Sequence, residues 1–172
     1  MLKDKEEIAL ILRLARMTDN VLSCCLGEIR AGMTEREVET RLEYNARTAG
    51  ADALAFRPTV ASGSRAAMPH YRCSRCRLSR GKPLLIDFGL EVGGYNSDLT
   101  RTFQLGKLTK RYREIYGIVL EAQQLALKEI RPGAAASSVD ACAREHIASR
   151  GFERHFGHGL GHGLGHVFRC AG

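Results

Sequence analysis

The hydrophobic pattern of the first fifty residues predicts two helices. Between Lys5 and Arg30 apolar side chains recur at intervals of three and four, which places them on one face of a helix. Thr34 and Glu37 form a capping-box signature, in which each side chain satisfies a free backbone N–H of the other residue. We therefore expect helices over about Lys5–Arg30 and Glu35–Thr48.

After residue 57 the pattern changes to that of strands, and near residue 110 the helical pattern returns. The expected strands are Pro58–Ser62, Pro83–Gly89 and Tyr95–Gln104, with a turn over Glu91–Gly94, and the expected later helices are Lys110–Ile130 and Ser138–Arg150. This order predicts an α+β fold with helices on one side of a mostly antiparallel sheet. It differs from the regular alternation of strands and helices in a doubly wound fold.

The composition is that of an ordinary folded domain. Of the 172 residues, 44% are hydrophobic and 26% are charged, which excludes disorder over most of the chain. No apolar stretch approaches the roughly 18 residues that a membrane span requires. The charged start shows no secretory signal, so we expect a cytoplasmic protein with reduced cysteines.

The net charge of +7 raises the question of a nucleic-acid partner. Acidic residues are interleaved with the basic ones in most segments. The one basic segment, Arg72–Lys82, has only Tyr71 beside it to stack on a base, so a solvated loop is the favoured interpretation. We expect no nucleic-acid or membrane partner, and two copies of the chain could form a homodimer.

Asp87 and Asp98 are the first candidates for chemistry. Their midpoint falls between Val92 and Gly93, in the middle of the expected turn. A hairpin centred there would place the two carboxylates directly opposite each other, with Cβ atoms about 4.5–5.5 Å apart. Such a pair repels unless one pKa rises or a divalent cation lies between them. A bulge that shifts the register and exposes both aspartates is the alternative.

The stretch Gly157–His166 alternates glycine with larger residues. Its glycines disfavour a helix by about 1 kcal/mol each. As a strand it would carry its histidines on one face, and its bare glycine face would imply close approach by another backbone. His158 and His162 would then be about 13 Å apart at 3.3 Å per residue, too far to bind one ion together. A flexible tail with incidental histidines is the alternative.

The remaining candidates are weaker. Cys73 and Cys76 form a single C-x-x-C pair, and a zinc site would need a second pair of ligands. His70 lies on a loop before the expected hairpin and alone indicates little.

Taken together, several stretches resemble the catalytic domain shared by Xaa-Pro peptidases and methionine aminopeptidases, the M24 metallopeptidases of pita-bread fold. The matching stretches are Ala61–Gly63, Pro69–His70, Leu85–Gly89, Gly94–Phe103 and Phe156–Gly165. The residues in these stretches are more similar to the Xaa-Pro branch of the family, which includes aminopeptidase P and prolidase, than to the methionine aminopeptidase branch.

The resemblance implies two divalent metal ions held by two aspartates, one histidine and two glutamates. By matching position, Asp87, Asp98 and His162 would be metal ligands, with Asp98 bridging both ions. His70 and His158 would contact the substrate or stabilise the transition state. The implied reaction is attack on the peptide carbonyl by a hydroxide bridging the metals, which could be Mn, Co, Zn or Fe. The implied substrate is a peptide with proline in the second position.

The sequence also departs from the family pattern. Arg169 and Cys170 stand where the family has a histidine followed by a glutamate, and His166 replaces an apolar residue. Neither glutamate ligand has a counterpart. We expect one catalytic domain over residues 1–172, incomplete in its second half and with no N-terminal domain before it, so this chain would be weakly active or inactive.

Other functions stay open at this point. One is a methionine aminopeptidase, and another is a pita-bread module that binds peptides or proteins without cleaving them. The number of metal ligands separates an enzyme from such a module. A basic nucleic-acid-binding domain would show salt-dependent binding, of which we expect little.

Overall fold

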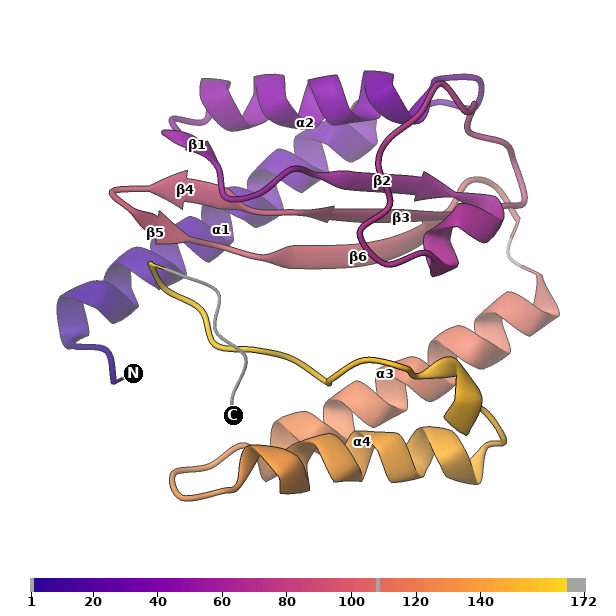
Figure 1. Cartoon of the computed structure of the whole chain (residues 1–172). Helices are drawn as coiled ribbons and strands as arrows, with labels where there is room; N and C mark the ends of the chain where they lie inside the picture. The colour runs from indigo at the N-terminus through magenta and orange to yellow at the C-terminus, as the bar shows by residue number, and fades with distance from the viewer. Residues whose placement is uncertain (1, 108, 167–172) are drawn as a thin grey trace. The chain divides into compact units, whose positions relative to one another are not determined.

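The structure, a computed structural model, describes residues 2–107 and 109–166. The chain forms two compact units (Figure 1). The first unit comprises Met1–Lys107 with Leu164–Val167, and the second unit comprises Leu108–Gly163 with Phe168–Gly172. No helix among the described residues is both long enough and apolar enough to cross a membrane.

The first unit begins with the two helices that the sequence predicts, α1 (Lys5–Glu28) and α2 (Glu35–Thr48). The predicted capping box at the start of α2 is confirmed. Thr34 Oγ1 accepts from the backbone N–H of Glu37, and Glu37 Oε2 accepts from the backbone N–H of Thr34. A second capping box, formed by Asp4 and Glu7, starts α1.

Two three-stranded antiparallel sheets follow in the first unit. One has the strand order β1-β4-β5 and the other β2-β3-β6. The strands are β1 (Ala53–Leu54), β2 (Thr59–Ser62), β3 (Pro83–Phe88), β4 (Leu90–Val92), β5 (Tyr95–Asn96) and β6 (Leu99–Gln104), and a short 3-10 helix, η1 (Gly63–Ala67), follows β2. The strand predicted over Tyr95–Gln104 is thus divided in two at Ser97 and Asp98.

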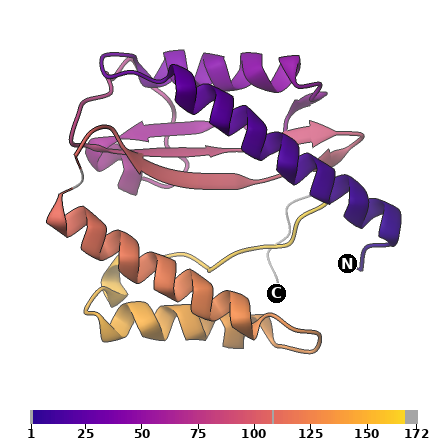
Figure 2. The same ribbon diagram turned by 180° about the vertical axis from the view of Figure 1, so that it is seen from behind.

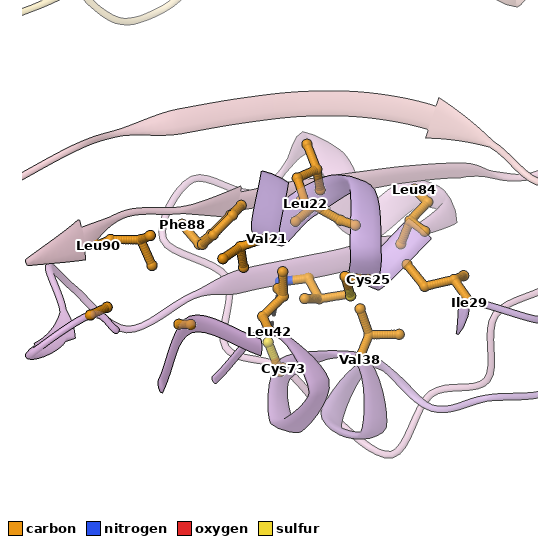
Figure 3. Packing of buried hydrophobic residues seen from close by; sticks show 14 of the residues in the cluster. Val21, Leu22, Cys25, Ile29, Val38, Leu42, Cys73, Leu84, Phe88 and Leu90 are labelled. Carbon is orange, nitrogen blue, oxygen red and sulfur yellow. Dashed lines mark hydrogen bonds between the residues drawn. The ribbon is translucent and has the colours of Figure 1, made fainter. Parts of the chain in front are cut away.

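The core of the first unit lies between the helices and one face of the strands. Along β3 every second side chain is buried, which is the period of a strand with one face on the core. Helix α1 crosses this face obliquely (Figure 2), and its apolar side chains meet those of the strands and of α2 (Figure 3). The largest fully buried side chains include Leu14, Val21, Val38, Leu42, Leu84, Ile86, Phe88 and Leu90.

The second unit is built on helices α3 (Lys110–Glu129) and α4 (Ala136–Ser149), followed by the 3-10 helix η2 (Glu153–His155). The two helices pack side by side through Ile118, Ala122, Ala126, Ala143 and Ile147. Phe156 and Leu160, from the segment after η2, pack against this cluster. Both helices confirm the predictions from the sequence, although α4 begins two residues earlier than predicted.

The strand predicted over Gly157–His166 is wrong. Residues 157–166 are all described, and no strand forms there. A Cβ built on Gly157, Gly159 or Gly161 would meet no atom within 4 Å, whereas the carbonyl of Gly165 accepts from the backbone N–H of Asn96 at 2.9 Å. Alternation selects a face only when a neighbouring strand supplies hydrogen bonds, and glycine otherwise favours no one conformation.

Candidate metal and peptide site

The hairpin that carries the two aspartates has a different centre from the one predicted. Asp87 is paired with Thr100, so the expected direct opposition of Asp87 and Asp98 is wrong. The cause is the turn, because Gly93 and Gly94 have φ values of 58° and 78°, as in a two-residue type I′ turn. The centre therefore lies between Gly93 and Gly94, one residue beyond the predicted point.

The two aspartates are diagonal neighbours instead. Counting along the register of β3 and β6, Asp98 lies two residues beyond the Asp87–Thr100 pair and level with Gly89. Positions two apart on one strand share a face, and diagonal neighbours are typically about 7–8 Å apart. Both aspartates are partly buried, and Asp87 Oδ1 accepts a hydrogen bond of 2.7 Å from Thr100 Oγ1.

Buried hydroxyls hold the residue before Asp98. Ser97 is only 4% exposed, and its Oγ lies 2.6 Å from Thr18 Oγ1 of α1. Thr18 Oγ1 also donates to the carbonyl of Leu14, at 2.9 Å. Ser97 Oγ also accepts from the N–H of Leu90, at 2.9 Å. Through these contacts Ser97, two residues before β6, is hydrogen-bonded to both α1 and β4. They therefore fix the backbone position next to Asp98.

Thr18 is a residue that the sequence analysis missed. It is 1% exposed and lies on the core face of α1, between Leu14 and Val21. A threonine at a core position of a predicted helix indicates a buried hydrogen bond, because a buried hydroxyl needs partners. Its second partner is distant in the sequence and could not be identified from it.

His70 lies on the loop between β2 and β3. It is exposed, and its φ of 53° makes it the one described residue other than glycine in the left-handed region. That conformation costs an ordinary residue about 1–3 kcal/mol and persists only where the surroundings determine it. The loop therefore presents His70 in a definite, strained conformation.

In the second unit, an ion pair on α4 holds the segment that carries His158. The Arg144 guanidinium binds both carboxylate oxygens of Asp140, at 2.9 and 3.1 Å, and donates to the carbonyls of Phe156 and His158. Asp140 also accepts from the N–H of Leu160, at 2.8 Å. The bonds from Arg144, and next the one from Leu160, lower the pKa of Asp140. The sequence analysis did not identify this pair as part of the site.

The rings of His158 and His162 make the same local hydrogen bond. In each, Nδ1 faces the carbonyl of the following glycine, at 2.8 Å for Gly159 and 3.1 Å for Gly163. A carbonyl can only accept, so Nδ1 is the donor in both hydrogen bonds. This arrangement is common for histidines that bind metals, because it fixes the tautomer.

Cys73 is a core residue rather than an exposed ligand. It is 3% exposed, its Sγ accepts from the N–H of Val60, and burial raises the pKa of its thiol to about 11. Metals bind the thiolate, which this environment disfavours. Among residues 2–107 and 109–166, no group of three histidine, cysteine, aspartate or glutamate side chains gathers where one metal ion could be held.

Comparison with known proteins confirms the resemblance drawn from the motifs. The model of metallopeptidase family M24 matches residues 9–171. The Xaa-Pro dipeptidase of Pyrococcus furiosus is 42% identical over 158 residues, which are 92% of this chain and 45% of that protein. The Xaa-Pro dipeptidase of Pyrococcus horikoshii is 40% identical with the same coverage.

Solved structures give the same result. The X-Pro aminopeptidase of Thermotoga maritima matches with a TM-score of 0.96 and 39% identity, over 100% of this chain and 49% of that one. The prolidase of Pyrococcus furiosus matches with a TM-score of 0.94 and 41% identity, over 98% of this chain and 50% of that one. The chain thus spans about half the length of these relatives. It belongs to metallopeptidase family M24, and its α+β architecture is that of the matching half of the pita-bread fold.

Proposed function

We propose that this chain carries the first half of a metal-dependent centre that hydrolyses peptide bonds preceding proline. The observation that carries this proposal is the aspartate pair. Asp87 and Asp98 lie diagonally across one hairpin, in a chain of family M24. The Thr100 hydroxyl donates to Asp87, and the Ser97 hydroxyl bonds to Thr18 and so anchors the residue before Asp98.

The donor set fits divalent metal ions. Asp87 and Asp98 would supply carboxylate oxygens and His162 its Nε2, a combination that suits Mn, Co, Zn or Fe. When bound, two such ions would polarise the peptide carbonyl and activate the attacking water. The two glutamates implied by the family have no matching position in this sequence. We therefore propose weak metal binding by the chain itself, with catalysis requiring the two glutamates from outside it.

The chain's own histidines would act on the peptide. His158 keeps an acceptor at Nε2, because its Nδ1 proton is used on Gly159. It would therefore accept a hydrogen bond from the substrate. His70, exposed on its loop, would approach the peptide from the first unit. Both roles are those implied by the family motifs.

The substrate class comes from the relatives. Those with about 40% identity are named Xaa-Pro dipeptidases, and a structural neighbour is an X-Pro aminopeptidase. Dipeptides and longer peptides with proline in the second position are both compatible with this proposal.

A hybrid enzyme tests the function. The matching 158-residue segment of this chain would replace its counterpart in the Pyrococcus furiosus Xaa-Pro dipeptidase, which supplies the rest of the fold. We expect the Mn²⁺-loaded hybrid to hydrolyse alanyl-proline, and alanyl-alanine far more slowly. Asp98→Asn should lower kcat by roughly 100-fold or more, because even residues that only support a metal ligand are worth about 10–100-fold. Asp19→Asn, the same change on an exposed residue of α1, is the matched control.

The result can contradict the proposal in two ways. A folded hybrid that binds metal but cleaves neither dipeptide would favour a module that binds peptides without cleaving them. Equal activity in the Asp98→Asn and Asp19→Asn hybrids would remove Asp98 from the mechanism.

A further inference from the structure

Glu35 is a fully buried carboxylate that the proposed chemistry does not use. It is the first residue of α2, and its exposed fraction is 0%. Burying a carboxylate is costly unless hydrogen bonds or charges compensate for the lost water. The start of a helix provides part of this compensation, because its free N–H groups favour negative charge. No ion pair to Glu35 occurs among the residues that the structure describes.

Four donors surround the Glu35 side chain, and they come from the two ends of one loop. Oε1 accepts from the backbone N–H of Ser62, at 2.9 Å, where β2 ends. Oε2 accepts from Tyr71 Oη at 2.8 Å, from the Ser74 N–H at 3.1 Å and from Ser74 Oγ at 2.7 Å. Burial raises the pKa of Tyr71, so its phenol keeps the proton that it donates at neutral pH. One carboxylate therefore joins Ser62 to the Tyr71–Ser74 segment.

The backbone at the start of α2 binds the same segment. The N–H of Glu35 donates to the carbonyl of Cys76, at 3.0 Å, and the N–H of Arg36 donates to the carbonyl of Ser74, at 3.1 Å. These N–H groups have no partner within the helix, so the loop satisfies them. The loop over residues 63–70 thus leaves and re-enters one hydrogen-bonded cluster centred on Glu35.

His70 lies immediately before the point where the loop re-enters this cluster. Its neighbour Tyr71 bonds directly to Glu35, and His70 itself is held at a φ of 53°. A strained conformation persists only where its surroundings determine it. Two hydrogen bonds at Tyr71 are the nearest such constraints along the chain: its hydroxyl donates to Glu35, and its carbonyl accepts from Thr59 Oγ1 at 3.2 Å.

We propose that Glu35 is a positioning residue, which sets the place and conformation of His70 by holding both ends of its loop. This inference rests on the role proposed above for His70 at the peptide. A carboxylate suits this task because it has only acceptors, enough for all four donors. Glutamine has the same shape, but its –NH₂ group would face either the N–H of Ser62 or that of Ser74.

Amide hydrogen exchange on the purified chain tests this proposal without any need for activity. We expect Glu35→Gln to speed exchange at Ser62, at Ser74 and across the loop by at least about tenfold, while the amides of β3 stay unchanged. The matched control is Glu43→Gln, the same substitution on the exposed face of α2. The His70 imidazole resonance, assigned with His70→Asn, should shift in Glu35→Gln and not in Glu43→Gln.

A second, milder variant distinguishes a local effect on the loop from a global loss of structure. Tyr71→Phe removes only the hydroxyl that bonds to Glu35, and it should produce the same local effects at smaller size. Unchanged loop exchange in both variants, or an equal rise in the loop and β3, would overturn the proposal. So would a His70 resonance that does not move. None of these results depends on hydrolysis, so they separate this inference from the proposed function.

Discussion

Substituting alanine for Gly89 should disrupt the hairpin at the point where Asp98 leaves it. Gly89 connects β3 to β4 and is buried. A Cβ built on it would lie 1.9 Å from the carbonyl oxygen of Ser97 and 2.9 Å from Cε1 of Phe56. Carbon–oxygen contacts normally begin at about 3.3 Å, so the two backbone segments must separate by about 1.4 Å. The carbonyl oxygen of Ser97 belongs to the main chain, so no change of rotamer can relieve its contact with the new Cβ.

The size of the effect follows from what this separation breaks. The N–H of Ser97 donates to the carbonyl of Leu90 at 2.8 Å, and the N–H of Leu90 donates to Ser97 Oγ at 2.9 Å. A shift of about 1.4 Å would lengthen both beyond hydrogen-bonding range, at about 1 kcal/mol each. Overpacking a buried site costs a further 1–3 kcal/mol or so. We therefore expect Gly89→Ala to lower the free energy of unfolding by about 3–5 kcal/mol.

Thermal unfolding followed by circular dichroism measures this. For a chain of this length each kcal/mol lowers Tm by about 2–4 °C, so the expected loss is about 6–20 °C. Gly27→Ala is the control, because Gly27 is exposed on α1 and a Cβ there meets nothing within 4 Å. If Gly89→Ala melted within about 2 °C of the unsubstituted chain, the close approach of Ser97 to Gly89 would be contradicted.

Three further predictions concern stability. Phe88→Ala, in the core of the first unit, should lower the free energy of unfolding by about 3–5 kcal/mol in urea denaturation, and a loss below 1 kcal/mol would place Phe88 outside a packed core. Gly117→Ala should raise it by about 0.5–1 kcal/mol, because Gly117 lies within α3 with nothing within 4 Å of a Cβ, and a decrease would contradict that open space. The folded-state pKa of Asp140 is lowered by Arg144, so its contribution is complete above the ordinary carboxyl pKa of 3.8 and is lost as pH falls below it. Unfolding measured between pH 6 and about 3 should therefore show a loss that Asp140→Asn reduces, and an identical pH profile in both chains would contradict the ion pair.

Local signals in the sequence predict the helices well. The Thr34–Glu37 capping box involves residues only three apart, and it predicts where α2 begins. Helix α2 also ends at Thr48, as the sequence predicts. Helix α1 follows the apolar spacing to within two residues. The period of two along β3 likewise identifies its buried face.

Features that depend on distant partners could not be predicted in the same way. The sequence shows the two-glycine turn, but the predicted hairpin centre lies one residue before the observed one, and this difference changes the residue opposite Asp87. The alternation over Gly157–His166 indicated a strand, yet a strand exists only where another strand pairs with it. Glu35 resembles any acidic residue in the first turn of a helix, and its burial depends on the loop that covers it.

The candidate site was predicted mainly through its motifs. The positions of Asp87, Asp98, His70, His158 and His162 follow from the family resemblance, whereas the contacts that orient them do not. Thr18 holds Ser97 across 79 residues of sequence, and no local pattern indicates that pairing.

Metal binding by the purified 172-residue chain tests the central claim most directly. Equilibrium dialysis against Mn²⁺, with the bound metal counted by mass spectrometry, requires neither substrate nor a hybrid. The account predicts weak but saturable binding that falls at least about tenfold in Asp98→Asn, and is unchanged in Asp19→Asn, where an exposed carboxylate is removed. Binding of equal strength in all three chains, or no saturable binding in the unsubstituted chain, would contradict the assignment of Asp87 and Asp98 as metal ligands.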